Sequence, residues 1–176
     1  ELITEEMSAV QKGGFAHFML KEIHEQPQVA RELLHRLESD SAVDDILESI
    51  KHARNVYFMG CGTSYHACLA GSVYFAQLAH RTVIPVVSTQ FIPQYLPTIG
   101  KEDVGIFVSQ SGETKDVLNA LYAAQKAGMT CYSMANVIGS TLTRATIACL
   151  PLCCGYEISV PATKTFTNQV ISFLYL

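Results

Sequence analysis

The sequence has few charged residues and no excess of basic ones. Charged side chains make up 16% of the 176 residues, below the usual share of about 25%, and the formal net charge is −4. A nucleic-acid-binding protein usually carries a basic patch, so we expect no nucleic-acid partner. The sequence also lacks an uncharged apolar stretch of about 20 residues, so we expect no membrane span.

Motifs built on cysteine and histidine are missing as well. The six cysteines form no CxxC pair, and no HExxH pattern occurs. A chain this large and apolar does not need a disulfide framework, so we expect reduced core thiols in a cytoplasmic protein. We expect no cofactor and no metal site.

Apolar residues are abundant and occur in short runs. They make up 49% of the sequence, and the mean hydropathy is +0.21, which excludes a disordered chain. The length corresponds to one domain. Because the chain opens on Glu1 and closes inside an apolar run, we expect a piece of a longer protein.

The apolar runs alternate with segments of helical periodicity. Strands are expected at residues 56–59, 83–87, 104–108, 129–134 and 145–150, with helices at about 15–37, 43–52, 63–78, 88–95 and 114–127, and from about 140 and 162 onward. Pro27 either kinks the first helix or begins a second one, and Pro85 indicates an edge strand. This alternation predicts an α/β fold, a three-layer αβα sandwich with a five-stranded parallel sheet.

A loop rich in hydroxyl groups follows the third expected strand. This serine loop consists of Ser109, Gln110, Ser111, Gly112, Glu113 and Thr114. It precedes a helix, whose N-terminus carries free N–H groups and about +0.5 charge, so it suits an anion. The loop has no Lys and no GxxxxGK[ST] pattern, which disfavours a nucleoside triphosphate. It predicts a phosphate monoester site, and the alternative is that its hydroxyls only cap the helix.

Two further loops stand at the ends of expected strands, where ligands of parallel sheets bind. Thr63 and Ser64 follow residues 60–62, which begin like a dinucleotide fingerprint but lack its third glycine. These two hydroxyls either bond a sugar or cap a helix. The other loop leads through Val160 to Lys164, which we interpret as a solvated lysine rather than a phosphate partner.

The sequence offers no positioned acid–base pair. Glu113 lies in the serine loop, and Glu157 stands alone. His66 is expected at the surface, and Cys61 has no base nearby in sequence that would support a nucleophilic role. We therefore assign no catalytic residue in this chain.

Three motifs together resemble the sugar isomerase (SIS) domain. They are GCGTSY at residues 60–65, SQSGET at 109–114 and EISVPATKTFT at 157–167. The upstream run HFMLKEIHEQP at 17–27 is similar to the start of the isomerase half of the glutamine–fructose-6-phosphate aminotransferase (isomerizing) family. The resemblance implies a flavodoxin-like or Rossmann-like fold. It divides the chain into a linker from a missing N-terminal glutaminase domain (1–13) and the first SIS subdomain with its N-terminal helical segment (14–176).

The resemblance also implies a site and an activity. The residues that it assigns to sugar-phosphate binding are Thr63, Ser64, Ser109, Gln110, Ser111, Thr114 and Val160. The complete enzyme would make glucosamine 6-phosphate from fructose 6-phosphate and glutamine-derived ammonia, as a homodimer. Its acid–base residues would lie in a second SIS subdomain or a neighbouring subunit, so this chain alone would be inactive.

The sequence departs from the family pattern at one point. The usual VASTK is replaced by VPATK at residues 160–164, so Ala162 stands in place of a serine and a hydroxyl contact is lost. Two alternatives stay open. One is a stand-alone SIS phosphosugar isomerase or deglycase, and the other is an SIS sugar-phosphate sensor of a transcriptional regulator.

Overall fold

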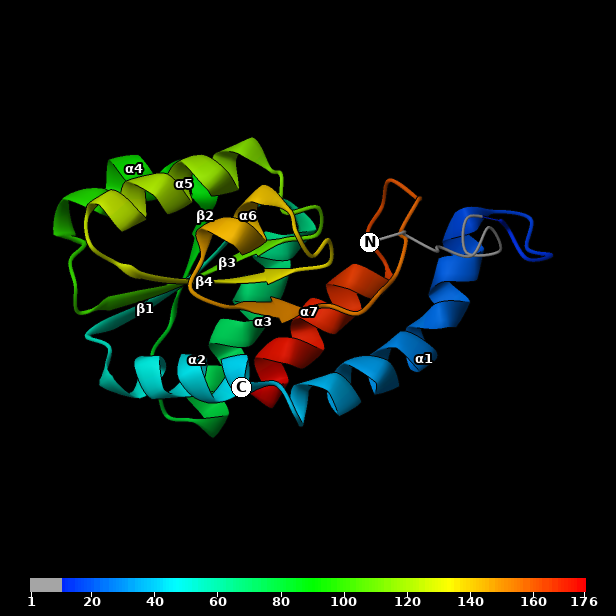
Figure 1. Cartoon of the computed structure of the whole chain (residues 1–176), viewed down its shortest axis with the longest axis horizontal. Coiled ribbons are helices and arrows are strands. Elements are labelled where there is room, and N and C mark those ends of the chain that lie inside the picture. Colours follow the sequence, from blue (N-terminus) through cyan, green and yellow to red (C-terminus); the bar gives the residue numbers. More distant parts are fainter. Residues whose placement is uncertain (1–10) are drawn as a thin grey trace.

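Helices and strands alternate along the chain, as the apolar pattern predicts. The computed structural model describes residues 11–176 (Figure 1). The helices are α1 (Phe18–Leu37), α2 (Ser41–His52), α3 (Thr63–Leu78), α4 (Ser88–Gln94), α5 (Lys115–Lys126), α6 (Thr141–Ala145) and α7 (Lys164–Tyr175). The strands are β1 (Asn55–Gly60), β2 (Ile84–Val87), β3 (Asp103–Ser109), β4 (Thr130–Ala135) and β5 (Cys149–Pro151). Among the helices within residues 11–176, none has both the length and the apolar character needed to cross a bilayer.

The strands form one parallel sheet in the order β2-β1-β3-β4-β5. This confirms the predicted five-stranded parallel sheet, and it is the strand order of flavodoxin-like folds. β2, which contains Pro85, lies at an edge as expected. The chain runs outward from β1 to β2 and then crosses back to β3. The carboxyl ends of β1 and β3 therefore border the crevice where such sheets bind ligands.

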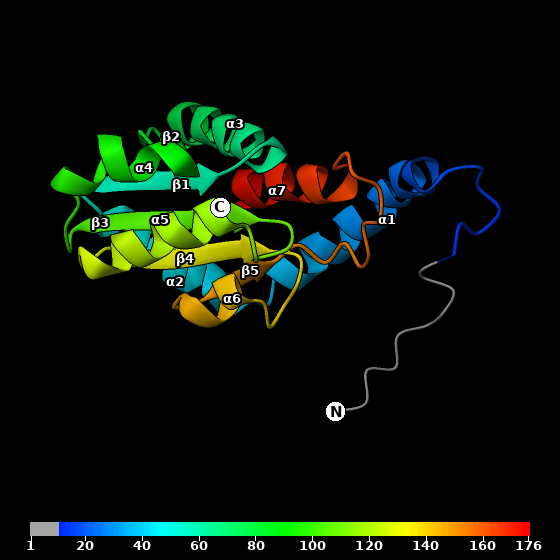
Figure 2. The same cartoon turned by 90° about the horizontal axis from the view of Figure 1, so that it is seen from above.

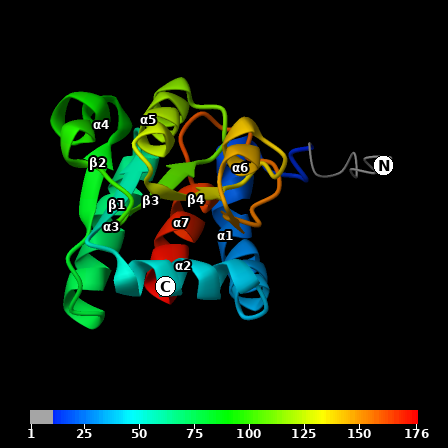
Figure 3. The ribbon, with the colours of Figure 1, turned by 60° about the vertical axis from the view of Figure 1, so that its left-hand side comes forward.

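Helices cover both faces of the sheet (Figure 3). The core under α1, α2, α3 and α7 includes Leu33, Ile46, Phe58 and Phe173. The core under α4, α5 and α6 includes Phe91, Phe107, Leu121 and Leu142. Burial on both faces explains why the strands are continuous apolar runs, and β3 is buried along its whole length.

α7 packs against both α3 and α1, and it begins beyond the carboxyl ends of the strands (Figure 2). Gly71 permits the close approach of α3, because a Cβ atom there would lie 2.7 Å from Cγ of Phe173. Phe173 in turn stacks on Phe58 of β1, with ring centroids 4.3 Å apart. This packing brings the start of α7 to the same edge of the sheet as the start of α3.

Several sequence-based boundaries differ from the structure. β5 does not span residues 145–150, because Ala145 still belongs to α6 and the strand begins only at Cys149. α1 is one helix that passes through Pro27, and Figure 1 shows it curving along its length, as expected where a proline removes a helical hydrogen bond. Most of the expected linker, residues 1–10, lies outside the described residues.

Candidate functional site: a hydroxyl-lined cavity at the carboxyl edge of the sheet

A cavity of about 220 Å³ lies between the segments that follow β1 and β3. It is lined by all seven residues that the sequence predicts to bind substrate, namely Thr63, Ser64, Ser109, Gln110, Ser111, Thr114 and Val160. These residues come from the start of α3, from the serine loop and from the segment before α7, which we call the strap (residues 157–163). The tertiary structure therefore brings three segments, far apart in sequence, to the point where the strand order reverses.

The serine loop is closed by its own hydroxyl groups. Ser109 is 3% exposed, and its Oγ accepts a hydrogen bond from the backbone N–H of Gly112 at 3.1 Å. The same Oγ lies 2.9 Å from Thr114 Oγ1, with which it shares a second bond. Ser111 Oγ accepts from the backbone N–H of Glu113 at 3.2 Å, which leaves its own proton available for a ligand.

The serine loop also rests on the start of α6. Gly112 has a φ of +66°, and a Cβ atom there would lie 2.6 Å from Cβ of Ser140, so the position requires glycine. Glu113 Oε1 accepts from the backbone N–H of Thr141 at 2.7 Å, and this bond lowers the pKa of the Glu113 carboxyl. Glu113 is therefore ionised at neutral pH and is engaged with α6.

The hydroxyls of the site do not serve as helix caps. The N-cap positions of α3 and α5 are Gly62 and Thr114, and within the described chain neither makes a side-chain capping bond. Thr114 bonds Ser109 instead. The N–H groups in the first turn of α5 thus lack a side-chain cap and remain for water or a ligand.

Ser64 is oriented by a side chain of α7. Gln169 Nε2 donates to Ser64 Oγ at 3.1 Å, and Gln169 is 1% exposed. Because Ser64 Oγ already accepts this bond, its proton can be donated to a ligand in the cavity. Gln169 Oε1 has no hydrogen-bond partner among residues 11–176, so the amide is held by Ser64 and by packing.

The strap forms another wall of the cavity, through Glu157, Ser159, Val160 and Ala162. Val160, at its centre, is 99% exposed. Glu157 accepts from the backbone N–H groups of Thr163 at 2.8 Å and Thr165 at 3.2 Å, and both threonine hydroxyls also donate to it. Glu157 is therefore engaged by hydrogen bonds within the strap and at the start of α7, so the strap turns back on itself before this helix.

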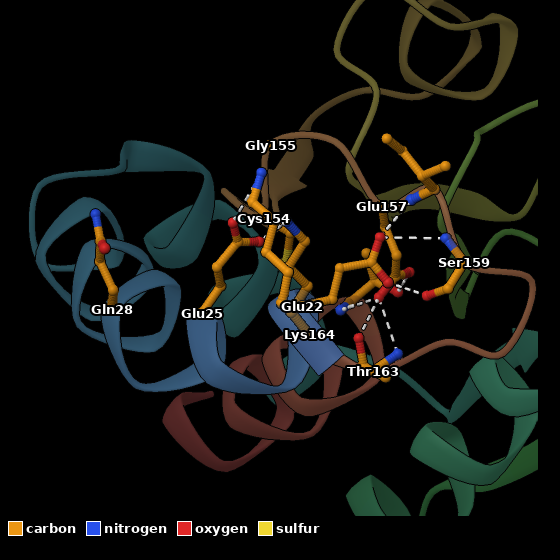
Figure 4. Close-up of polar contacts among 12 residues, drawn as sticks. Glu22, Glu25, Gln28, Cys154, Gly155, Glu157, Ser159, Thr163 and Lys164 are labelled. Carbon is orange, nitrogen blue, oxygen red and sulfur yellow. Dashed lines mark hydrogen bonds and ion pairs between the residues drawn. The ribbon is translucent and has the colours of Figure 1, made fainter. Parts of the chain in front are cut away.

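Two carboxylates of α1 meet the strap and the start of α7 (Figure 4). Glu22 is 2% exposed and accepts from the backbone N–H groups of Ile158 at 2.6 Å and Ser159 at 3.1 Å. Lys164 is 4% exposed, and its Nζ lies 2.6 Å from Glu25 Oε2. The interpretation of Lys164 as a solvated lysine is therefore wrong, since Glu25 compensates its charge inside the protein.

The remaining candidates of the sequence analysis stay at the margin of the site. His66 is exposed and does not line the cavity, as expected. Cys61 lines the cavity and is half-buried. All six cysteines are unpaired, and burial raises the pKa of the Cys131 and Cys154 thiols to about 12, so these two are unreactive core thiols.

Most of the chain matches one known domain family. Residues 49–176 match the SIS domain. The chain belongs to the SIS domain family. The match includes the start of α3, the serine loop and the strap, whereas α1 lies before it. This confirms the resemblance that the three motifs carry.

The curated relatives of this SIS domain are longer proteins. It is 42% identical over 161 residues to the glutamine–fructose-6-phosphate aminotransferase [isomerizing] of Pyrobaculum aerophilum. This match covers 92% of this chain and 26% of that protein. It is 38% identical over 177 residues to the protein of the same name from Chlorobaculum tepidum, and this match covers 97% of this chain and 29% of that protein. This SIS domain therefore spans less than a third of the length of either relative.

A solved structure shows the same relation. The C-terminal domain of glucosamine-fructose-6-phosphate aminotransferase from Francisella tularensis superposes with a TM-score of 0.83 at 27% identity. The superposition covers 93% of this chain and 47% of that one. This SIS domain thus corresponds to about half of that C-terminal domain.

Sequence reasoning missed the side chains that hold the cavity of this SIS domain in shape. Glu22 lies at helical spacing from Val29, Leu33 and Leu37, and these four are the buried residues of α1. The position of Glu22 on the apolar face of α1 was thus the feature of the sequence that could have indicated its burial. For Gln169 the signal was weaker, because several polar side chains of α7 are buried together with it.

Proposed function

We propose that this SIS domain binds fructose 6-phosphate and glucosamine 6-phosphate in the cavity, with the phosphate at the serine loop. The observation that carries the proposal is the convergence of seven predicted residues on one cavity in which hydroxyl oxygens already accept internal bonds. Ser64 accepts from Gln169, and Ser111 accepts from the backbone of Glu113. Hydroxyls in this state can donate to an anion, and Thr63, Ser64 and Val160 contact the sugar.

The phosphate is bound without a cationic side chain from this chain. Among the lining residues, all of which lie in the described range, the one charged side chain is Glu157, and its carboxylate is engaged by Thr163 and Thr165. The positive potential comes from the N-terminus of α5, which carries about +0.5 charge. A helix N-terminus with several hydroxyl donors is a sufficient site for one phosphate monoester.

The domain acts as the substrate-binding half of a larger enzyme. Its relatives named glutamine–fructose-6-phosphate aminotransferase are more than three times its length, which supports a glutaminase domain upstream, joined through residues 1–13, and a second SIS subdomain downstream of residues 14–176. In that enzyme, glutamine-derived ammonia adds to the ketone of fructose 6-phosphate, and a base moves a proton between C1 and C2. This chain orients the substrate, and the base lies outside it.

Assembly and compartment are part of the same proposal. The enzyme is a homodimer in the cytoplasm, where thiols stay reduced. The six unpaired cysteines support such a compartment. A single sedimentation experiment on the full-length protein tests the dimer.

Titration calorimetry on this chain tests the binding. Ser111→Ala or Thr114→Ala is expected to weaken fructose 6-phosphate binding by about 1–3 kcal/mol, as for a lost hydrogen bond to a charged group. The matched control is Ser72→Ala on α3, which should leave affinity unchanged because Ser72 does not line the cavity and its hydroxyl donates to the carbonyl of Leu69 in the same helix. Unchanged affinity in both loop variants would move the site elsewhere. Turnover of fructose 6-phosphate by the 176-residue chain would favour a stand-alone isomerase.

A further inference from the structure

One buried carboxylate holds the strap, and it belongs to α1, which precedes the residues that match the SIS domain. Glu22 of α1 accepts from the backbone N–H groups of Ile158 and Ser159 and from the hydroxyl of Ser159 (Figure 4). These partners lie 136 and 137 residues further along the chain. Burying a carboxylate is costly unless its oxygens are hydrogen-bonded, and here both oxygens of Glu22 are engaged by the strap.

The position of Glu22 is fixed by further contacts between α1 and α7. Glu25 pairs with Lys164, and Gln26 Oε1 accepts from Thr167 Oγ1 at 2.6 Å. One turn later, the backbone carbonyl of Val29 accepts from Asn168 Nδ2 at 3.1 Å. α1 thus lies along α7 as a rigid support, and Glu22 is the residue through which that support reaches the strap.

The two walls of the cavity have different supports. The serine loop is held by bonds among Ser109, Gly112 and Thr114, by the contact of Glu113 with α6 and by backbone bonds between Gln110 and the residues after β4. Within residues 11–176, the bonds that hold the serine loop do not involve α1, whereas the strap is held by Glu22 in addition to its own bonds to Glu157. Loss of Glu22 should therefore displace the strap and leave the phosphate end of the cavity in place.

We infer that Glu22 is a positioning residue that sets the strap, and with it the sugar end of the cavity, so that α1 is a functional part of the site although it lies outside the matched SIS segment. This inference rests on the proposed function. Four strap residues line the cavity, namely Glu157, Ser159, Val160 and Ala162. A displaced strap would shift the contacts that this wall makes to the sugar, whereas inorganic phosphate bound at the serine loop would not reach it.

The test compares two probes on matched variants of the chain. Calorimetry with fructose 6-phosphate and with inorganic phosphate is run on wild type, Glu22→Ala, Glu22→Gln and Glu32→Ala. Glu32 is the control, because it is an exposed carboxylate of α1 that accepts only from Gln28 in the same helix. Glu22→Gln keeps the side-chain length and one oxygen that can accept both backbone N–H groups, and its NH₂ can donate to Ser159 Oγ.

Glu22→Ala is expected to weaken fructose 6-phosphate binding by about tenfold and to leave the affinity for inorganic phosphate within about twofold. Glu22→Gln is expected to restore the ratio of the two affinities, and Glu32→Ala to leave it unchanged. If Glu22→Ala lost affinity for both probes by the same factor, or lost affinity for neither, the inference would be overturned. A wild-type chain that binds neither probe would overturn the proposed function instead, so the two failures are distinguishable.

Discussion

The serine loop and the strap both line one cavity, but they are built in different ways. The turn of the serine loop is closed locally, by bonds between residues at most five apart in sequence such as Ser109 and Thr114, and Glu113 then holds it against α6. The strap depends in addition on a much more distant residue, because Glu22 holds it across more than 130 residues. A site can thus combine a wall whose turn is closed by neighbouring residues with a wall that is positioned by a distant helix. The following three predictions test this difference.

The largest effect is expected at Gly112. Gly112→Ala combines a left-handed backbone with a clash against Ser140, so we expect a loss of about 3 kcal/mol in the free energy of unfolding and loss of both phosphate and sugar-phosphate binding. Chemical denaturation and calorimetry measure the two quantities.

The matched control for Gly112 is Gly139→Ala. Gly139 has a φ of +85°, but a Cβ atom there would meet nothing within 4 Å. This variant should lose about 1 kcal/mol of stability from backbone strain and keep its affinity for phosphate. If Gly112→Ala bound inorganic phosphate as wild type does, the serine loop would not depend on its contact with α6.

An intermediate effect is expected at Gln169. Gln169→Leu removes the donor to Ser64 but also removes a buried Oε1 that has no partner in residues 11–176. We expect sugar-phosphate affinity to fall by about 1 kcal/mol while the free energy of unfolding stays equal or rises. In a Ser64→Ala background the same substitution should change affinity no further, because the hydroxyl that it orients is gone. A parallel loss of stability and affinity would show that Gln169 only fills space.

The smallest effect is expected at Ala162 of the strap. Ala162 lines the cavity, at the position where the resemblance drawn from the sequence predicts a serine. Ala162→Ser should increase fructose 6-phosphate affinity by up to about 1 kcal/mol and leave inorganic phosphate unaffected, since the new hydroxyl lies on the sugar side. Ala162→Val, which adds bulk without a hydroxyl, is the control. An increase for inorganic phosphate as well would place the strap against the phosphate and would contradict the division between the two walls.

Much of the fold could be predicted because its signals are local. The continuous apolar strands, the edge position of Pro85 and the helix after the serine loop follow from short runs of residues, and the structure confirms them. β5 was less predictable, because it has only three residues, begins four positions after the end of α6 and carries little periodicity. The seven candidate residues were assigned from the resemblance of short motifs to the SIS domain, and the structure places all seven on one cavity.

The polar supports of the site could not be predicted, because their meaning depends on partners that are distant in sequence. The sequence alone suggests that Lys164 is a surface lysine, whereas the structure places Glu25 beside it. The sequence likewise shows no partner for Glu157, whereas the structure brings the backbone N–H of Thr163 to its carboxylate. A buried charge is stable only with its partners in place, and no short window of sequence contains both.

The sequence by itself determined the order of the elements, the hydroxyl-rich serine loop and the membership in the SIS domain family, because apolar periodicity and short motifs act over a few residues. The tertiary structure alone decided that the start of α3, the serine loop and the strap line one cavity, and that α1 supports it through Glu22. The physical reason is that strand order and helix packing depend on the burial of both faces of the sheet. That burial brings groups more than 100 residues apart, such as Ser64 and Gln169, within hydrogen-bonding distance of each other.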